Sequence, residues 1–271
     1  MNPLGLLQGD YRVFPNREIG LRLLEEAALN AWPSLETVYY DGWLLRFADG
    51  FTRRANSVNP VYSSMLPAAV KVRHCEALYA SRGLPSVFKM TPFSEPQGLD
   101  DLLETYGYRR AGVTSVQTLA LDSLKWTTIS ENLTIREKPD EEWLANYCLF
   151  NGVSDARRAL MERMLAAVIP TTAYAMLRNG GEPVALGLAV RERDLVGLFD
   201  ITTAPDMRGR GFGTQLIGAL LEWGAQEGAR HAYLQVMLSN SPALALYDKF
   251  GFAEVYRYWY RVKELTATQP G

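Results

Sequence analysis

The chain has 271 residues, 48% of them hydrophobic and 21% charged, a balance typical of a globular protein with enough apolar material for a core. Its formal net charge of −2 provides no overall basic field, which argues against nucleic acid or an anionic membrane surface as a partner. No apolar run approaches the roughly 20 residues that a membrane-spanning helix needs. At about 150 residues per domain, the length predicts two domains.

The cysteines, the histidines and the N-terminus predict a cytoplasmic protein without a metal site. Cys75 and Cys148 show no pairing pattern, which fits a reducing compartment. His74 and His231 do not combine with them at the spacing of a zinc site. Residues 1–14 lack the basic and apolar regions of a signal peptide.

Three segments of the first half have recognisable patterns. Asp41–Ser57 predicts a pair of strands around a turn at Ala48-Asp49-Gly50. Val72–Met90 predicts a helix, a glycine at its end and then a strand. The segment from Thr105 to Leu121 predicts a glycine turn followed by another strand.

Two helices and a three-stranded meander begin the second half. We expect helices around Glu141–Asn151 and Asp155–Val168, and the meander over residues 172–203. Asn179-Gly180-Gly181 predicts its first turn. The last strand of the meander is a short apolar, β-branched stretch that ends before Pro205, because proline cannot donate to a ladder.

The stretch RGRGFGT, which begins at Arg208, contains Gly209, Gly211 and Gly213 within five residues. Because ordered glycine costs backbone entropy, this density needs a physical reason. The helix that follows offers backbone N–H groups without intrahelical partners and the positive end of its dipole. Glycines let a bulky anion reach these donors, and Arg208 and Arg210 add positive charge. The pattern therefore predicts a site for phosphate or pyrophosphate.

Two common phosphate-binding motifs do not fit this loop. A P-loop needs Lys-Ser or Lys-Thr after its glycines, and neither follows here. A dinucleotide fingerprint needs a third glycine where this chain has Thr214 or Leu216.

The elements after the loop alternate between helix and strand. Apolar residues at helical spacing predict a helix that ends near Gly228. A strand over His231–Leu238, a helix that begins after Asn240 and a final strand over Glu254–Glu264 complete the chain.

This arrangement resembles the GNAT family of N-acetyltransferases. The loop matches the family signature Q/R-x-x-G-x-G/A, and the order of elements over residues 133–264 is that of the family. The resemblance implies an α+β fold and transfer of an acyl group, usually acetyl, from acyl-CoA to an amine. In the family, backbone groups at the end of the strand grip the pantetheine and the loop holds the pyrophosphate. The implied cofactor-binding residues are Ile201, Thr202, Thr203, Arg208, Gly209, Arg210, Gly211, Phe212, Gly213, Thr214 and Asn240.

The resemblance implies catalytic roles for two residues. Tyr247 matches the tyrosine that protonates the departing CoA thiolate, and an ordinary pKa of about 10 keeps a tyrosine protonated at neutral pH. The alternative is a core aromatic, because Leu244 and Phe250 are among its apolar neighbours in sequence. Asp200 is the candidate general base, and the equal alternative is that it caps a bulge or pairs with an arginine.

The first half repeats the pattern of the second. Gly83 and Gly228 are 145 residues apart, and so are Pro60 and Pro205, which indicates a duplicated fold. Where the second half has RGRGFG, the first has SSMLPA over residues 63–68, which offers no bare backbone donors to a pyrophosphate.

The catalytic positions also differ between the halves. Leu103 corresponds to Tyr247, and Pro96 corresponds to Asn240. We therefore expect two tandem GNAT-type mixed, mostly antiparallel sheets flanked by helices: a degenerate copy over residues 1–125 and a catalytic copy over residues 133–271. The boundary is expected within Ser123–Asn132.

The sequence thus predicts an N-acetyltransferase that uses acetyl-CoA as co-substrate and a primary amine of a small molecule or protein as acceptor. The alternative is a non-catalytic acyl-CoA-binding or sensor module. Trp43, Arg53, Arg54 and Asn56 could line an acceptor pocket, or they could form a solvated hairpin with a core tryptophan. We expect no nucleic-acid or membrane partner, and the sequence leaves the acceptor, the acyl length and the oligomeric state open.

Overall fold

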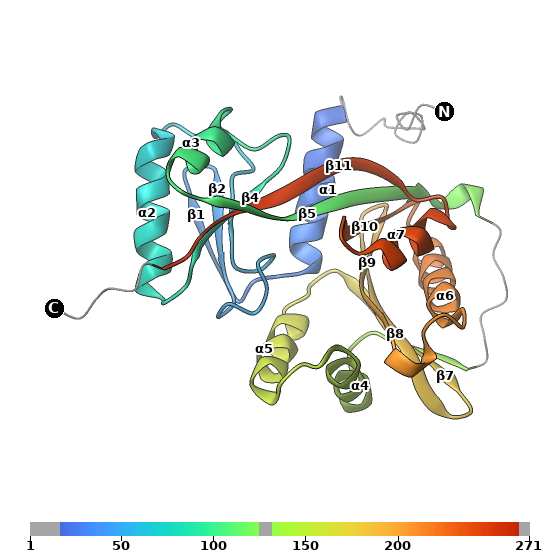
Figure 1. Cartoon of the computed structure of the whole chain (residues 1–271). Helices are drawn as coiled ribbons and strands as arrows, with labels where there is room; N and C mark the ends of the chain where they lie inside the picture. Colours follow the sequence, from blue (N-terminus) through green and yellow to red (C-terminus); the bar gives the residue numbers. More distant parts are fainter. Residues whose placement is uncertain (1–16, 125–131, 266–271) are drawn as a thin grey trace. The chain divides into compact units, whose positions relative to one another are not determined.

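A computed structural model describes residues 17–124 and 132–265 (Figure 1). The chain divides into two compact units, the first containing the residues up to Ala31 and Ser115–Val255, and the second containing Trp32–Thr114 and the residues from Tyr256. The expected boundary falls mainly on residues 125–131, which lie outside the described residues, as does the N-terminal stretch 1–14.

The first unit is built on a mostly antiparallel sheet with the strand order β5–β10–β9–β8–β7–β6. β6 to β9 are antiparallel neighbours, whereas β9 and β10 are parallel. The predicted meander is confirmed, with its first turn at Gly180-Gly181. The strands are β5 (Arg109–Ala120), β6 (Leu133–Arg136), β7 (Thr171–Asn179), β8 (Glu182–Glu192), β9 (Leu195–Thr203) and β10 (His231–Met237).

Helix α6 (Phe212–Gln226) covers one face of this sheet, as the apolar spacing predicts. Leu216 and Leu220 are fully buried in the core of the unit, and each such burial contributes roughly 1.5–3 kcal/mol. Gly224 permits close packing, because a Cβ there would lie 2.7 Å from a methyl group of Val196 on β9.

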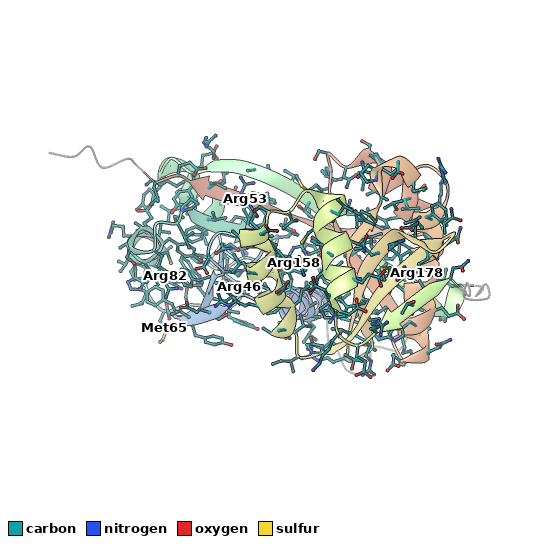
Figure 2. All side chains as sticks on the ribbon, turned by 90° about the horizontal axis from the view of Figure 1, so that it is seen from below. Arg46, Arg53, Met65, Arg82, Arg158 and Arg178 are labelled. Carbon is teal, nitrogen blue, oxygen red and sulfur yellow. The ribbon has the colours of Figure 1, made fainter. Side chains whose placement is uncertain are left out.

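Helices α4 (Glu141–Asn151) and α5 (Asp155–Ala166) pack on the other face, and both were predicted. The Trp143 ring of α4 lies against Tyr174 of β7, whose neighbours Ala173 and Ala175 point into the α6 side. Arginines hold α4 in place (Figure 2): Arg158 of α5 pairs with Glu141, and Arg178 of β7 pairs with Glu142.

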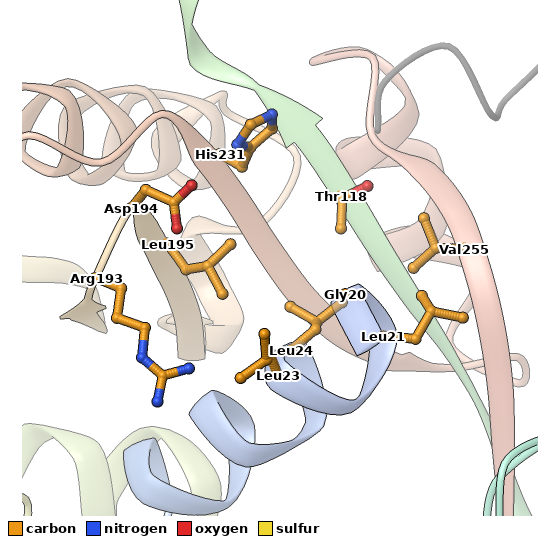
Figure 3. Close-up of a pocket in the computed structure, with 10 residues that line it drawn as sticks. All are labelled: Gly20, Leu21, Leu23, Leu24, Thr118, Arg193, Asp194, Leu195, His231 and Val255. Atoms are coloured by element: carbon orange, nitrogen blue, oxygen red, sulfur yellow. The ribbon is translucent and has the colours of Figure 1, made fainter. Parts of the chain in front are cut away.

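Helix α1 (Arg17–Ala31) also belongs to this unit, and the sequence analysis did not predict it. Its buried residues Leu21, Leu24, Ala28 and Ala31 follow helical spacing, which would have identified it. Between α1 and the start of β9 lies a cavity of about 30 Å³ lined by Leu24 and Leu195 (Figure 3), with room for about two water molecules.

The second unit has the strand order β1–β2–β3–β4–β11 and its own apolar core. The predicted helix–glycine–strand over residues 72–90 is confirmed by α2 and β4. Its elements are β1 (Glu36–Tyr40), β2 (Trp43–Phe47), β3 (Val58–Asn59), α2 (Ala68–Ser81), β4 (Ser86–Met90), α3 (Leu99–Thr105) and β11 (Ala253–Lys263).

The expected turn at residues 48–50 is present, with the Phe51 N–H donating to the Ala48 carbonyl at 2.9 Å, but the strand that pairs with β2 after it begins only at Val58 and not directly after the turn. The hairpin instead joins β1 to β2 through Asp41 and Gly42, whose φ angles of 44° and 82° give the two-residue turn that matches strand twist. Residues 51–57 form turns rather than a strand, held by Asn56, whose side chain bonds the backbone of Ala48 and Gly50.

The division into compact units assigns two strands differently from the division into sequence halves. β11, the last strand of the second half, pairs with β4 from Trp259 opposite Met90 to Lys263 opposite Ser86. Conversely, the end of β5, the last strand of the first half, lies in the first unit from Ser115 onward. Each compact unit is therefore completed by the final strand of the other half.

Candidate active site

The edge of the candidate site is a bulge in β9. Leu188 of β8 faces Phe199, but Leu186, two residues before it, faces Thr202, so β9 contains one extra residue. Asp200 lies in this bulge with a φ of 51°, a left-handed conformation that is uncommon for a residue with a side chain. Of the interpretations that the sequence left open, the structure thus places Asp200 in a bulge, while its role as a base remains a prediction.

The parallel strands β9 and β10 separate beside this bulge. Their register runs from Leu195–His231 to Leu198–Leu234, and both strands then continue, to Thr203 and to Met237. On the other side, Thr202 and Thr203 stay paired with β8. The register of β9 with β10 thus ends before Ile201, and we call the edge of β9 at Ile201, Thr202 and Thr203 the slot.

The glycine loop connects the end of β9 to α6. Gly209 and Gly211 have φ angles of 76° and 84°, and Gly211 is the N-cap of the helix. A Cβ at either position would meet no atom within 4 Å, so the conformation and not crowding calls for glycine there. Arg208 folds back and donates from Nε to the Thr203 carbonyl at 3.3 Å. Arg210 and Thr214 are exposed on the loop and first turn.

The start of α6 lies close to β9 and to helix α7 (Ser241–Asp248). A Cβ at Gly213 would lie 3.3 Å from Leu246 of α7 and 3.6 Å from Thr203. Glycine at this position therefore lets the two helices approach the end of the strand. The first residues of α6, from Phe212 to Thr214, have N–H groups without intrahelical acceptors. These donors therefore lie near the end of β9.

Helix α7 carries the two further predicted residues. The Asn240 side chain caps the helix by accepting from the Ala243 N–H at 3.3 Å, which leaves its amide N–H groups for a ligand. The Tyr247 ring is half-buried against the core and packs edge-on to Phe252 at 5.9 Å. Burial and, to a lesser extent, the charge of Asp200 raise the pKa of Tyr247 to about 12.

One residue near Asp200 was not singled out from the sequence. Tyr174 of β7 is 2% exposed, and burial together with the charge of Asp200 raises the pKa of its hydroxyl well above the usual range. The carboxylate therefore lies within electrostatic reach of two phenols, Tyr174 and Tyr247. Asn151, at the end of α4, accepts a hydrogen bond from Thr202 at 3.5 Å and closes this side of the slot.

The arrangement joins backbone donors for an anion, a slot for an extended chain, a carboxylate and a protonated phenol. Within residues 17–124 and 132–265, no cluster of three or more His, Cys, Asp or Glu side chains could hold a metal ion. None of the helices in these ranges has both the length and the apolar character needed to cross a membrane.

Two of the four first-half residues proposed for an acceptor pocket are buried. Trp43 is fully buried, with the Lys71 ammonium 3.8 Å from its ring centre, and Asn56 is 6% exposed. For Trp43 the core alternative is correct, whereas Asn56 is buried and so does not belong to a solvated hairpin. The Arg54 guanidinium lies 5.6 Å from the Trp32 ring, and Arg53 lies near Gly112 in the same unit.

Known proteins are similar in sequence to this chain over most of its length. Residues 19–261 match the family described as "Probable histone acetyltransferase Rv0428c C-terminal". The "Uncharacterized N-acetyltransferase YobR" of Bacillus subtilis is 31% identical over 246 residues, which cover 90% of this chain and 98% of YobR. The "Probable histone acetyltransferase Rv0428c" of Mycobacterium tuberculosis is 29% identical over 242 residues, or 88% of this chain and 72% of the relative.

Solved structures share the fold. A GCN5-related N-acetyltransferase from Kribbella flavida superposes with a TM-score of 0.67 at 14% identity, covering 91% of this chain and 96% of the other. A tandem GNAT protein from the clavulanic acid biosynthesis pathway gives a TM-score of 0.55 at 15% identity, covering 71% and 69%. At these identities the likeness concerns the fold alone.

The fold and the site define an acetyltransferase of the GNAT kind, with the α+β architecture predicted from the sequence. The match over residues 19–261 and the coverage of YobR show that the chain belongs to the GNAT family of N-acetyltransferases.

Proposed function

We propose that the protein transfers an acetyl group from acetyl-CoA to a primary amine, with the cofactor bound in the C-terminal half. One observation carries this proposal: the open glycine loop at the start of α6 stands at the end of a bulged strand, beside the slot. A helix N-terminus with accessible N–H groups stabilises a phosphate through hydrogen bonds and its dipole. The extended slot suits the pantetheine arm.

In this proposal each part of CoA has its own partners. The pyrophosphate accepts from N–H groups of Arg208 to Thr214, and the arginines add charge. The pantetheine amides pair with the backbone of Ile201, Thr202 and Thr203 beyond the last pair in the register of β9 with β10, in the manner of an added strand. The Asn240 amide, held in place by its capping bond, donates to the cofactor from the opposite side.

The proposed reaction is direct attack of a neutral amine on the thioester. The nitrogen forms a bond with the carbonyl carbon and the carbon–sulfur bond breaks. The proton lost by the nitrogen passes to Asp200, and Tyr247 gives its hydroxyl proton to the thiolate. Exchange with solvent then restores both side chains, so the net products are the amide and CoA. The raised pKa of Tyr247, about 12, supports this role because the phenol stays protonated at neutral pH.

The acceptor belongs to the class of primary amines, and its identity stays open. Relatives carry names with different acceptors. The ribosomal protein bS18-alanine N-acetyltransferase of Escherichia coli is 32% identical over 78 residues, and the streptothricin acetyltransferase of Streptomyces lavendulae is 39% identical over 54 residues. These matches cover only 29% and 20% of this chain, so they do not select one acceptor. We also propose that the first half is a degenerate copy that binds no CoA.

Turnover with acetyl-CoA tests the proposal directly. Thiol release should be measured with spermidine, kanamycin and a short peptide with a free N-terminal alanine, with and without the protein. Amine-dependent release and an acetylated product are expected. Tight binding of acetyl-CoA without amine-dependent release would favour the sensor alternative, and absence of both would contradict the proposed site.

A further inference from the structure

Tyr174 has a buried hydroxyl for which the described residues provide no hydrogen-bond partner. Other buried tyrosines are satisfied: the Tyr79 hydroxyl donates to the Arg46 carbonyl at 2.8 Å, and that of Tyr108 bonds Ser86 at 2.8 Å. Leaving a buried hydroxyl unpaired costs free energy, so native structures pair such groups with protein, water or a ligand. The Tyr174 hydroxyl therefore requires a partner that a reaction could supply.

The packing around Tyr174 fixes where its hydroxyl lies. Its ring meets the Trp143 ring edge-on at 5.2 Å, and Trp143 is itself stacked on Tyr147 and donates to the Ala175 carbonyl at 3.1 Å. The Tyr174 side chain is thus fixed between β7 and α4 and cannot swing out to solvent without breaking these contacts.

The register of the sheet aligns Tyr174 with the bulge. Tyr174 is opposite Leu188, and Leu188 is opposite Phe199, so these three side chains share the face that α4 covers. Asp200 follows Phe199 directly. The charge of Asp200 reaches the phenol and, with burial, raises its pKa, so the hydroxyl is neutral at physiological pH. A neutral hydroxyl can accept a hydrogen bond from an N–H group.

We propose that the Tyr174 hydroxyl and the Asp200 carboxylate together bind the nucleophilic nitrogen of the acceptor, which makes Tyr174 a further substrate-binding residue of the reaction. The hydroxyl oxygen accepts a hydrogen bond from one N–H of the amine, and the carboxylate accepts one from the other. The amine lone pair is then directed away from both oxygens, toward the thioester. This inference rests on the proposed function, because it assumes that the acceptor is an amine and that Asp200 takes its proton.

The substitution Tyr174→Phe tests this role, with Tyr79→Phe as matched control. Both remove one hydroxyl from a buried ring, but Tyr79 has backbone partners in the second unit and Tyr174 has none in the described structure. Tyr174→Phe should raise the KM for the amine by about 10-fold, the effect of one lost hydrogen bond, and leave the KM for acetyl-CoA unchanged. Its melting temperature should equal or exceed that of the wild type. Tyr79→Phe should show the reverse: a lower melting temperature and unchanged kinetics.

The outcomes separate this inference from the proposed function. Wild-type protein that releases no thiol with any amine overturns the proposed function and this inference with it. An active wild type whose amine KM is unaffected by Tyr174→Phe overturns this inference alone. A fall in melting temperature as large as that of Tyr79→Phe also overturns it, because the hydroxyl would then have a structural partner.

Discussion

The loops that precede helices α6 and α2 both carry backbone N–H groups, but the loop before α6 is exposed and the N–H groups before α2 bind a side chain of the protein. At α6, Gly209 and Arg210 stand before the N-cap Gly211, and the loop is exposed. At α2, Met65 and Leu66 stand before the N-cap Pro67. Each helix begins a helix–strand–helix–strand series in its half: α2–β4–α3–β5 in the first and α6–β10–α7–β11 in the second.

At α2 a carboxylate of the protein itself occupies the backbone donors. Asp41 accepts from the Met65 N–H at 3.0 Å and from the Leu66 N–H at 2.9 Å. The fully buried Lys71 ammonium lies 3.3 Å from the same carboxylate. The Asp41-Gly42 turn brings the carboxylate there, and a Cβ at Gly42 would lie 2.2 Å from the Ser63 carbonyl. The Asp41 carboxylate thus occupies backbone donors before α2, whereas we propose that the loop before α6 binds an external anion.

Under the proposal that the first half is a degenerate copy, the loss of the cofactor loop involved more than the loss of glycines. The N–H groups of Met65 and Leu66 need a hydrogen-bond acceptor, and an anion is a favourable one. Without a ligand, another group must accept from them. Asp41 supplies that partner and also compensates Lys71. Met65 itself is 94% exposed (Figure 2), so the loop is held by its backbone contacts and not by side-chain burial. The comparison can be tested at each of these residues.

The largest effect is expected at the tyrosine that the first half lacks. Tyr247→Phe keeps the ring and its contact with Phe252 but removes the only proton that the side chain can give. General acid catalysis typically contributes about 10²–10⁴-fold, so kcat should fall within that range where chemistry limits turnover. Since the pKa of Tyr247 is about 12, the wild-type kcat should show no loss from this group between pH 8 and 10.

Acetyl-CoA affinity and the melting temperature provide the controls for Tyr247→Phe, and both should change little. A large loss of stability with kcat within about twofold of wild type, well below the range for general acid catalysis, would assign Tyr247 to the core instead. At the position that the proposed duplication aligns with Tyr247, Leu103 is fully buried in the core of the second unit.

The next largest effect is expected at Gly211. A β-branched residue strongly disfavours its φ of 84°, so Gly211→Val should distort the loop and weaken acetyl-CoA binding. Hydrogen bonds to a charged group contribute roughly 1.5–3 kcal/mol each, so losing one should raise Kd by about 10-fold or more in a calorimetric titration. Gly228→Val is the matched control, because Gly228 has a φ of 89° beyond the other end of the same helix. It should cost similar stability and leave Kd unchanged, and equal losses of affinity in both variants would contradict the loop assignment.

The second half was largely predictable from the sequence because its signals are local. The meander, α6 and α7 follow from apolar spacing, glycines and an asparagine cap, each confined to a few neighbouring residues. The misplaced hairpin in the first half is also local: Ala48-Asp49-Gly50 and Asp41-Gly42 are both turns that contain Asp-Gly, but only the second joins two strands directly.

Apart from α1, whose signal is local, what the sequence did not predict depends on distant partners. The pairing of β11 with β4 joins segments more than half the chain apart, and no local pattern specifies it. The bulge at Asp200 can be recognised only from the register between β8 and β9. The lack of a hydrogen-bond partner for the Tyr174 hydroxyl can be recognised only once the surrounding side chains are placed. Tyr174 alternates with Ala173 and Ala175 like any buried strand residue, so its sequence context predicts only packing.

A smaller effect, on stability alone, is expected from Asp41→Asn. The Met65 and Leu66 N–H groups, and then Lys71, lower the pKa of Asp41 in the folded protein. The ionised carboxylate therefore stabilises the fold above its unfolded pKa of about 3.9, and this contribution is lost as the pH falls through the lower folded value. The variant should melt several degrees below the wild type at pH 7, and the difference should shrink below pH 4. A difference that is the same at both pH values would show that the charge of Asp41 does not stabilise the loop.

The smallest expected effect is on the number of CoA molecules bound, which should be one per chain in the wild type and in Asp41→Asn. In the wild type the donors before α2 are taken by Asp41, and Pro67 at the N-cap has no N–H to add. Replacing the carboxylate with an amide removes the internal charge but leaves an oxygen that still accepts from one N–H, and the side chains of the SSMLPA loop remain.

Gly211→Val is the complementary variant in this experiment, because it should weaken the single site without revealing another. Calorimetric titration with CoA measures the stoichiometry in all three proteins. A second site of comparable affinity in the wild type would show that the first half is not degenerate, and a second site that arises only in Asp41→Asn would show that the internal carboxylate alone closes it.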